Sequence, residues 1–277
     1  MPVNLVPLAK HRPTVARAQS LCDSMRPAEA RALRVLMVVE SSAGGTGRHV
    51  LDLAEGLALR GCDVHVIYST IRLDKLFTER LSEIRGVRHL SLPIKTSPHP
   101  SDIKVVRAVR RYMKEFGPFD LIHGHSSKGG AIARLAAPGT GAKPFYTLHG
   151  LIMMDPLLPR WKWLFYLSIE LALAFPTAKI IAVSPEEQRA AVGLGFGKSR
   201  VALIPNGVGK IRLTPRPEAR KTMGVAGDAI VIGFVGRLVE QKAPEVLLEA
   251  FASTYKACGR ARLALVGGGR LEPNMRD

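Results

Sequence analysis

The sequence predicts an α/β fold made of two doubly wound lobes, of which the second is incomplete. Short apolar runs rich in Val and Ile alternate with segments of helical apolar spacing along most of the 277 residues. A strand, a glycine-containing loop and a helix follow one another near residue 35 and again near residue 230. Such alternation is typical of parallel sheets with right-handed helical crossovers, and the length allows about two domains.

The first lobe is expected over residues 33–205. The apolar run at 35–39 is short and β-branched, which is typical of a strand buried on both faces. The glycines within 44–47 follow as a loop, and a helix with one apolar face comes next. Further strands are expected at 64–68, 87–92, 121–123, 145–148, 180–183 and 201–204. Together they form a single parallel sheet. Ser184 and Glu187 have the spacing of a capping box, which predicts the start of a helix between the last two of these strands.

The remaining segments flank this lobe. Residues 1–32 carry four prolines and scattered basic side chains, and are expected to be a basic flexible leader in which Met25 is an alternative start. Residues 206–228 are rich in proline and charge and are expected to be a linker. The second lobe, 229–277, holds a strand at 230–236, a helix from Pro244 and a strand at 263–266. These elements are too few for a complete domain of this type.

The formal charge of +17 favours anionic partners. Nucleic acid is disfavoured, because the basic residues are spread over both lobes without stacking aromatics between them. The three cysteines are widely spaced, and no secretion signal is evident, so a cytoplasmic location is expected. The apolar stretch 163–175 is too short to span a bilayer. The segment 161–175 either packs on the sheet or docks on anionic lipid as a peripheral contact at the inner face of the membrane.

Gly236, Arg237 and Lys242 form the first candidate site. They lie between a buried strand and a helix whose first residue is Pro244, which is a preferred first helical residue. Ligands of doubly wound folds bind at the carboxyl edge of the sheet, and a helix N-terminus attracts phosphate. Two cations at this place predict a diphosphate site, with an ordinary solvated loop as the alternative.

A second candidate is the loop of Gly44, Gly45, Thr46 and Gly47, where absent side chains let a phosphate or sugar approach the backbone. A purely structural turn explains any one of these glycines equally well. The loop differs from a dinucleotide fingerprint, because Val50 occupies the third glycine position and no acidic residue ends the second strand. An enzyme using NAD is therefore disfavoured.

Histidines at strand ends form the third candidate. His149 follows the strand at 145–148, while His123 and His125 end the strand before it and precede Lys128. A neutral imidazole can donate and accept a hydrogen bond, as contact with a sugar requires. His149 is the first candidate for catalysis, and His125 and Lys128 are candidates for contact with substrate.

Five motifs in order resemble family 4 of the retaining glycosyltransferases, and the resemblance covers about residues 34–269. They are the segments 44–49, 120–125, 147–150, 204–208 and 234–238 with Lys242. One departure is Ala243, where the family commonly has glycine. The family's paired glutamates of the second lobe are also missing, which suggests C-terminal truncation.

The resemblance implies a GT-B fold, in which two Rossmann-like lobes close over an activated sugar donor without a cofactor and usually without a metal. It implies that Arg237 and Lys242 bind the donor diphosphate, that His149 contacts the transferred sugar and that the glycine loop lies near donor and acceptor. The resemblance also implies that Asn206 lies on the hinge side of the cleft. Charge-assisted hydrogen bonds to a leaving diphosphate would act as preorganised electrostatic catalysis.

The sequence thus predicts a glycosyltransferase that moves a sugar from a nucleotide-diphosphate donor to a glycan or lipid-phosphate-linked acceptor with retention, in polysaccharide or glycolipid biosynthesis. The alternative is a truncated, inactive protein that binds a sugar or phosphate ligand. Missing glutamates in the second lobe favour that alternative, while the order of the five motifs favours the enzyme.

Overall fold

The computed structural model describes residues 31–209 and 213–275. The chain forms two compact units that divide between Gly209 and Lys210, a few residues beyond the predicted end of the first lobe at 205. Most of the expected leader 1–32, including Met25, lies outside the described residues.

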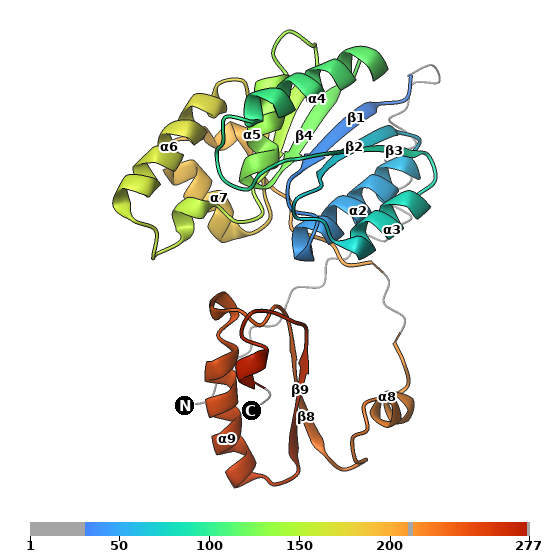
Figure 1. The fold of residues 1–277 in the computed structure, drawn as a ribbon, viewed down its shortest axis with the longest axis vertical. Coiled ribbons are helices and arrows are strands. Elements are labelled where there is room, and N and C mark those ends of the chain that lie inside the picture. Colours follow the sequence, from blue (N-terminus) through green and yellow to red (C-terminus); the bar gives the residue numbers. More distant parts are fainter. Residues whose placement is uncertain (1–30, 210–212, 276–277) are drawn as a thin grey trace. The chain divides into compact units, whose positions relative to one another are not determined.

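The first unit contains one seven-stranded sheet with the order β3-β2-β1-β4-β5-β6-β7 (Figure 1). Every neighbouring pair is parallel, so the predicted α/β doubly wound fold is confirmed. The strands are β1 Arg34–Val39, β2 Asp63–Ser69, β3 Val87–Leu92, β4 Leu121–His125, β5 Lys143–Thr147, β6 Lys179–Ala182 and β7 Val201–Leu203.

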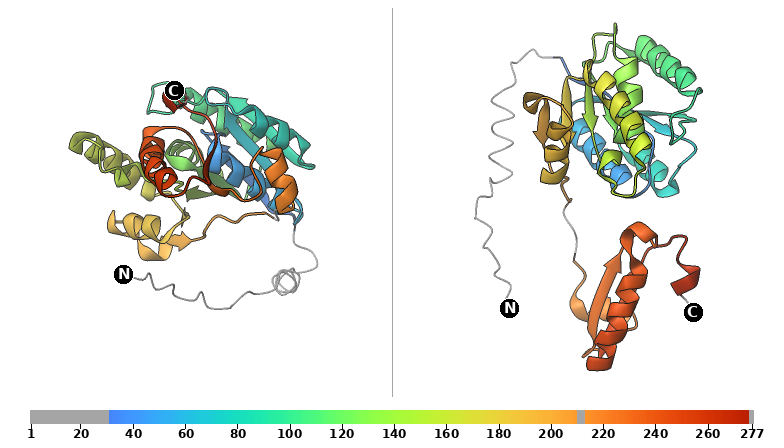
Figure 2. Two further views of the ribbon diagram at one scale, coloured as in Figure 1. Left: turned by 90° about the horizontal axis from the view of Figure 1, so that it is seen from below. Right: turned by 90° about the vertical axis from the view of Figure 1, so that its left-hand side faces the viewer.

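Helices connect these strands and cover both faces of the sheet (Figures 1 and 2). Leu36 and Val38 pack into one apolar cluster with α4 and α5, while their neighbours Val35, Met37 and Val39 pack into another with α2 and α3. Both faces of the central strand are therefore buried, as its unbroken apolar sequence requires. The helices are α2 Gly44–Ala58, α3 Lys75–Glu83, α4 Asp102–Phe116, α5 Ser126–Ala136, α6 Arg160–Ala174 and α7 Pro185–Gly193, with short turns η1 Ile152–Met154 and η2 Lys198–Arg200.

Glycines bring two helices unusually close to the sheet. A Cβ on Gly130 of α5 would lie 2.3 Å from the Tyr146 ring, and one on Gly129 would lie 2.5 Å from the carbonyl oxygen of Val38. In α2, a Cβ on Gly47 would lie 1.7 Å from the carbonyl oxygen of Ser42. Only glycine allows these approaches. The approaches of Gly129 and Gly130 hold the first turns of α5 against β1 and β5, and that of Gly47 holds the first turn of α2 against the segment that follows β1.

The segment 44–47 is the first turn of α2, and the expectation that it forms a loop is wrong. Gly44 begins the helix, and no side chain caps its N-terminus. Gly47 packs against the carbonyl of Ser42 in the segment 40–43 that connects β1 to α2.

The order of the strands reverses between β1 and β4. The chain passes from β1 to β2 on one side, whereas β4 lies on the other side of β1. At such a switch point the crossovers diverge, and a crevice opens at the carboxyl ends of the strands. The helices α2 and α5 both begin at this edge.

Helix α6 is apolar on nearly all sides. Trp163 and Tyr166 pack against the buried cluster beneath them, whereas Trp161 is 67% exposed and Leu164 is 55% exposed. Packing on the sheet therefore fits the face with Trp163 and Tyr166, and docking on lipid fits the face with Trp161 and Leu164. Within the described residues no helix is both long and apolar enough to cross a membrane.

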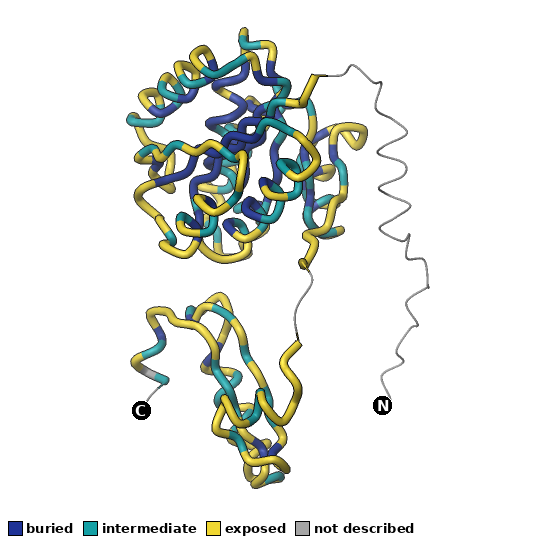
Figure 3. The backbone as a smooth tube through the Cα atoms, turned by 90° about the vertical axis from the view of Figure 1, so that its right-hand side faces the viewer, coloured by how far each residue is buried: buried dark blue, intermediate teal, exposed yellow. Residues whose placement is uncertain are grey.

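The second unit contains a parallel pair of strands, β8 Ile230–Val235 and β9 Ala261–Val266, with α8 Arg216–Thr222, α9 Pro244–Ala257 and the turns η3 Glu240–Lys242 and η4 Pro273–Met275. Figure 3 shows that most of its chain is exposed or intermediate, whereas the first unit has a buried centre.

The expected linker 206–228 requires a correction, because it contains α8. Pro217 lies in the first turn of that helix, where proline is tolerated. Arg220 then bonds the carbonyl oxygens of Ala226 and Ala229, which ties the helix to the start of β8.

Candidate functional site

Three histidines from separate elements meet at the switch point of the first unit. His49 comes from α2, His125 ends β4, and His149 follows β5. The His49 ring centroid lies 4.7 Å from that of His149 and 5.5 Å from that of His125. A nitrogen of His125, Nδ1, lies 3.3 Å from Nε2 of His149. The sequence predicted His125 and His149 at one edge, and the structure brings them into contact.

His123 lies behind this group and supports it. Its ring centroid lies 4.1 Å from that of His125, with the two rings tilted by 35°, and its Nε2 lies 2.7 Å from Oγ1 of Thr147 on the neighbouring strand. His123 is therefore an internal residue that positions His125.

The environment keeps these imidazoles uncharged. Burial, together with repulsion from His49 and His149, lowers the pKa of His123 to about 3. Burial and the neighbouring His49 lower the pKa of His149 to about 4. Burial is also the main reason why the pKa of His125 lies well below its usual value and that of His49 is lowered. Each ring thus offers one donor and one acceptor near pH 7.

His149 has a left-handed backbone, with φ of 51°. A non-glycine residue in this region is strained by about 1–2 kcal/mol and persists only where its surroundings hold it. Glu187 of α7 supplies that restraint: its Oε1 accepts a 2.6 Å bond from the N–H of Gly150, and its Oε2 accepts one from Val183. The predicted helix start is confirmed, because the Ser184 hydroxyl accepts a bond from the N–H of Glu187.

Asn206 also joins the site, because its side chain interacts with the imidazole of His49 and opposes the lowering of the His49 pKa. Arg48, next to His49, pairs with Asp52 on the exposed side of α2. Gly44 and Gly45 have open space where a Cβ would lie, so a ligand could approach their backbone. Thr46 lies in the same turn, whereas Gly47 is buried against Ser42.

Lys128 is placed differently from the histidines. Its Nζ donates to the carbonyl oxygen of Ser97 at 2.8 Å and to Oδ2 of Asp102 at 2.5 Å. The side chain is 8% exposed. Lys128 thus joins α5 to the segment before α4, and it lines a cavity beside the histidines.

The same three histidines could hold a metal ion. One nitrogen from each of His49, His125 and His149 lies within 4.8 Å of the others. In a tetrahedral zinc site with Zn–N bonds of about 2.0–2.1 Å, the ligand nitrogens are about 3.4 Å apart. His125 Nδ1 and His149 Nε2 are already 3.3 Å apart, and the sequence expectation of a metal-free site remains a prediction.

Arg237 and Lys242 lie on one tight turn of the second unit, next to the N-terminus of α9. Arg237 Nη2 donates to Oε1 of Gln241 at 3.4 Å, and both basic side chains are exposed. Gly236 donates its N–H to Val266 and so ends the strand pairing. Ala243 has φ of 46°, a left-handed conformation that costs alanine more than glycine. This turn presents two exposed cations beside the N-terminus of α9, an arrangement that suits a phosphate.

Sequence reasoning missed two residues of the site. The sequence pattern includes His49 only in the motif at 44–49, although its place in the helix that follows the central strand was a usable signal. Glu187 was interpreted only as part of a capping box, and its contact with Gly150 depends on tertiary packing.

Comparisons with known proteins agree with this arrangement. Residues 43–209, more than half of the chain, match the family model of Glycosyltransferase Family 4. The chain is 29% identical over 257 residues to the D-inositol 3-phosphate glycosyltransferase of Actinosynnema mirum, covering 84% of this chain and 60% of that protein.

Solved structures show the same fold. HepE from Anabaena, in complex with UDP and glucose, matches with a TM-score of 0.68 and 20% identity over 88% of this chain and 63% of that one. Sucrose-phosphate synthase from Thermosynechococcus elongatus matches with a TM-score of 0.67 and 22% identity, over 85% and 62%. Both likenesses support the GT-B architecture. The chain spans a little over half the length of these relatives.

Proposed function

The chain belongs to glycosyltransferase family 4, and we propose that it transfers a sugar from a nucleotide-diphosphate donor to a glycan or lipid-phosphate-linked acceptor, with retention. The observation that carries this proposal is the group of uncharged histidines at the carboxyl ends of β4 and β5. Sugar hydroxyls both donate and accept hydrogen bonds, and neutral imidazoles can match them in both roles.

His149 would contact the transferred sugar near its anomeric carbon. During transfer the bond from that carbon to the diphosphate breaks, a bond to the acceptor oxygen forms, and the proton of the acceptor hydroxyl passes to an oxygen of the departing diphosphate. Negative charge grows on the departing diphosphate. Arg237 and Lys242 would bind that charge, helped by the N-terminus of α9. No cofactor is required for this chemistry, and we expect none.

UDP-glucose is the donor to test first, because HepE is complexed with UDP and glucose. The test is transfer or hydrolysis of labelled UDP-glucose and other nucleotide sugars by this chain. The anomeric configuration of any product is assigned by NMR. We expect turnover that falls at least tenfold in His149→Ala and is unchanged in His99→Ala, an exposed histidine outside the cluster. Turnover should persist after treatment with a chelator.

Calorimetric binding of nucleotide sugars without any turnover would contradict the proposal. That result would instead support the sequence-based alternative, a protein that binds such ligands without catalysis.

We also propose a cytoplasmic location with peripheral contact at the inner face of the membrane. The exposed face of α6 supports it: Trp161 and Leu164 lie there beside the exposed cations Arg160 and Lys162. Aromatic and basic side chains together favour the interface of anionic bilayers.

A further inference from the structure

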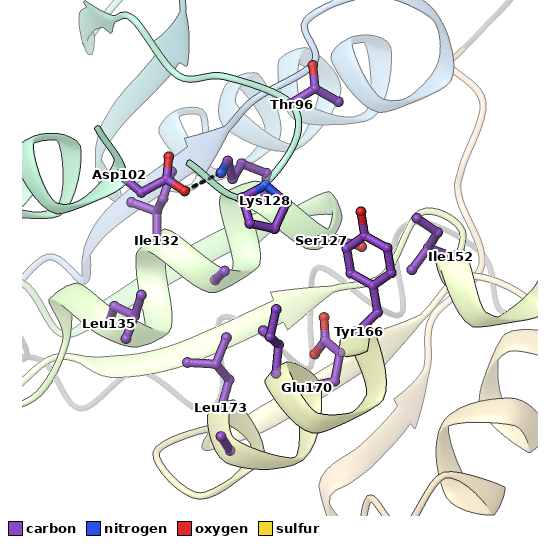
Figure 4. Close-up of a pocket in the computed structure, with 14 residues that line it drawn as sticks. Thr96, Asp102, Ser127, Lys128, Ile132, Leu135, Ile152, Tyr166, Glu170 and Leu173 are labelled. Atoms are coloured by element: carbon purple, nitrogen blue, oxygen red, sulfur yellow. Dashed lines mark hydrogen bonds and ion pairs between the residues drawn. The ribbon is translucent and has the colours of Figure 1, made fainter. Parts of the chain in front are cut away.

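A cavity of about 350 Å³ lies between α5, α6 and the segment that precedes α4 (Figure 4). Its walls are mainly apolar. Side chains from α5 and α6 face each other across it, Ile132 and Leu135 on one side and Tyr166 and Leu173 on the other. This volume falls at the lower end of the range of about 300–1,000 Å³ that is usual for small-molecule sites.

The apolar lining is only partly covered by protein. Leu135 contributes to the wall although half of its side chain is exposed. On α6 the residues Tyr166, Ile169, Glu170 and Leu173 recur at helical spacing and form the opposite wall. The only charged member of that row, Glu170, is bonded to the buried Arg134 at 2.7 Å. Apolar surface left open in this way gains free energy when an apolar group fills it.

One end of the cavity is polar. Asp102 lines it, and its Oδ2 accepts bonds from Lys128 Nζ and from the N–H of His99. The other oxygen, Oδ1, is buried and has no hydrogen-bond partner among the described residues. Buried acceptors without a partner are uncommon and costly. The cavity is therefore suited to a molecule with an apolar body and a hydrogen-bond donor at one end.

The polar end adjoins the histidine site through the chain itself. Ser127 and Lys128 line the cavity and follow His125 in the first turn of α5. The Oγ of Ser126, between His125 and Ser127, is also buried without a partner in the described part of the chain. Cavity and histidines thus share one edge of the sheet.

We propose that this cavity binds an apolar group of the acceptor, so that the acceptor is an amphiphile whose polar part lies toward the histidines. The inference rests on the proposed transfer reaction only in taking the bound molecule to be the acceptor. The binding that it predicts needs no sugar donor. The apolar group is either an alkyl or isoprenoid chain or an aromatic ring, which have in common the apolar surface that the lining requires.

The experiment is an NMR or calorimetric titration of the 277-residue chain without nucleotide sugar. Hexyl, heptyl and octyl β-glucosides are the probes, used below the concentrations at which they form micelles, with phenyl β-glucoside as the aromatic arm. We expect affinity to rise about fourfold per added methylene, as burial of each group in an apolar site predicts. Stronger binding of the phenyl than of the hexyl compound would assign an aromatic group, and the reverse would assign a chain.

Ala131→Phe fills the cavity from α5 and should weaken octyl glucoside binding at least tenfold, while Ala252→Phe on exposed α9 should not. If Ala131→Phe fails to fold, Leu135→Glu at the half-exposed rim replaces it, with the exposed Leu59→Glu as its control. Affinity that is independent of chain length, or binding unchanged in the folded cavity variants, would overturn the inference. Length-dependent binding without sugar transfer would support the cavity and count against the proposed reaction alone.

Discussion

The carboxylate of Glu187 accepts a 2.6 Å hydrogen bond from the backbone N–H of Gly150, the residue directly after His149. Glu187 is 6% exposed, and its second oxygen is bonded to Val183. The first turn of α7 thus fixes the backbone beside the strained His149. Glu187, which the sequence pattern assigns only to a helix cap, therefore positions the candidate catalytic His149.

Glu187→Ala should remove both bonds and release the strained backbone. Hydrogen bonds to a charged group contribute about 1.5–3 kcal/mol each, so we expect a fall of about tenfold to a hundredfold in kcat. Steady-state kinetics would measure it, with Glu186→Ala as the matched control because Glu186 is exposed and pairs with Arg189 at the surface. Equal losses in both variants would show that Glu187 has no special role.

Arg237→Ala and Lys242→Ala should each lower kcat/KM by about tenfold to a hundredfold, if each side chain binds the leaving diphosphate more strongly in the transition state. Lys256→Ala serves as control, because Lys256 is exposed in the last turn of α9, far along the helix from this turn. Wild-type kinetics with labelled donor in both variants would contradict the assignment.

Ala243→Gly should stabilise the second unit. Ala243 has φ of 46°, where a side chain costs about 1–2 kcal/mol, and glycine loses about 0.5–1 kcal/mol of that gain to its greater freedom in the unfolded chain. We expect a net gain of up to about 1 kcal/mol in the free energy of unfolding, measured by urea denaturation. A loss of stability would mean that the turn is held by the methyl group of Ala243.

Acid should destabilise the first unit through its histidines. His123 and His149 have folded pKa values of about 3 and about 4, below the ordinary value of 6.5. The unfolded chain therefore binds more protons than the folded one at intermediate pH. The stability that these groups contribute is complete above pH 6.5 and is lost as pH falls toward 4 and 3.

Each such histidine steepens the loss by up to about 1.4 kcal/mol per pH unit within this window. Urea denaturation of wild type and His149→Gln between pH 7.5 and 4.5 would measure the slope. The variant should be less sensitive to acid than wild type, and the exposed His99→Gln should keep the wild-type slope. Parallel curves for all three proteins would contradict the pKa assignment.

The sheet was predictable because its strands repeat a strong pattern. Runs such as 35–39 are apolar at every position, and burial on both faces leaves few other structures for them. Two predictions were wrong, the loop at 44–47 and the linker at 206–228, because neither glycine nor proline in the first turn excludes a helix. The glycines at 44–47 predict a loop but form the first turn of α2, where Gly47 packs against Ser42, and Pro217 lies in the first turn of α8 where proline predicts a break.

Only those site residues that lie at the ends of predicted strands could be predicted from the sequence. His125 and His149 follow neighbouring strands, and parallel strands end at one edge, so their contact followed from topology. His49 reaches them from a helix, and Glu187 reaches Gly150 from another. Neither contact has a signature in the spacing of residues, because each depends on how a helix packs on the sheet.

Replacing apolar side chains on the outer face of α6 should weaken membrane contact without unfolding the protein. Trp161 is 67% exposed and Phe165 is 48% exposed, so Trp161→Ser with Phe165→Ser removes little internal packing. Their insertion into the lipid interface would be lost in the variant, while the attraction of the basic surface for anionic lipid would remain. We expect wild type to float with phosphatidylglycerol vesicles at low salt and the variant to bind at least tenfold more weakly.

Leu59→Ser is the control, because Leu59 is 81% exposed at the end of another helix, and this variant should float like wild type. Equal flotation of all three proteins would assign the attraction to charge alone, because only the α6 variant loses apolar surface at the proposed contact.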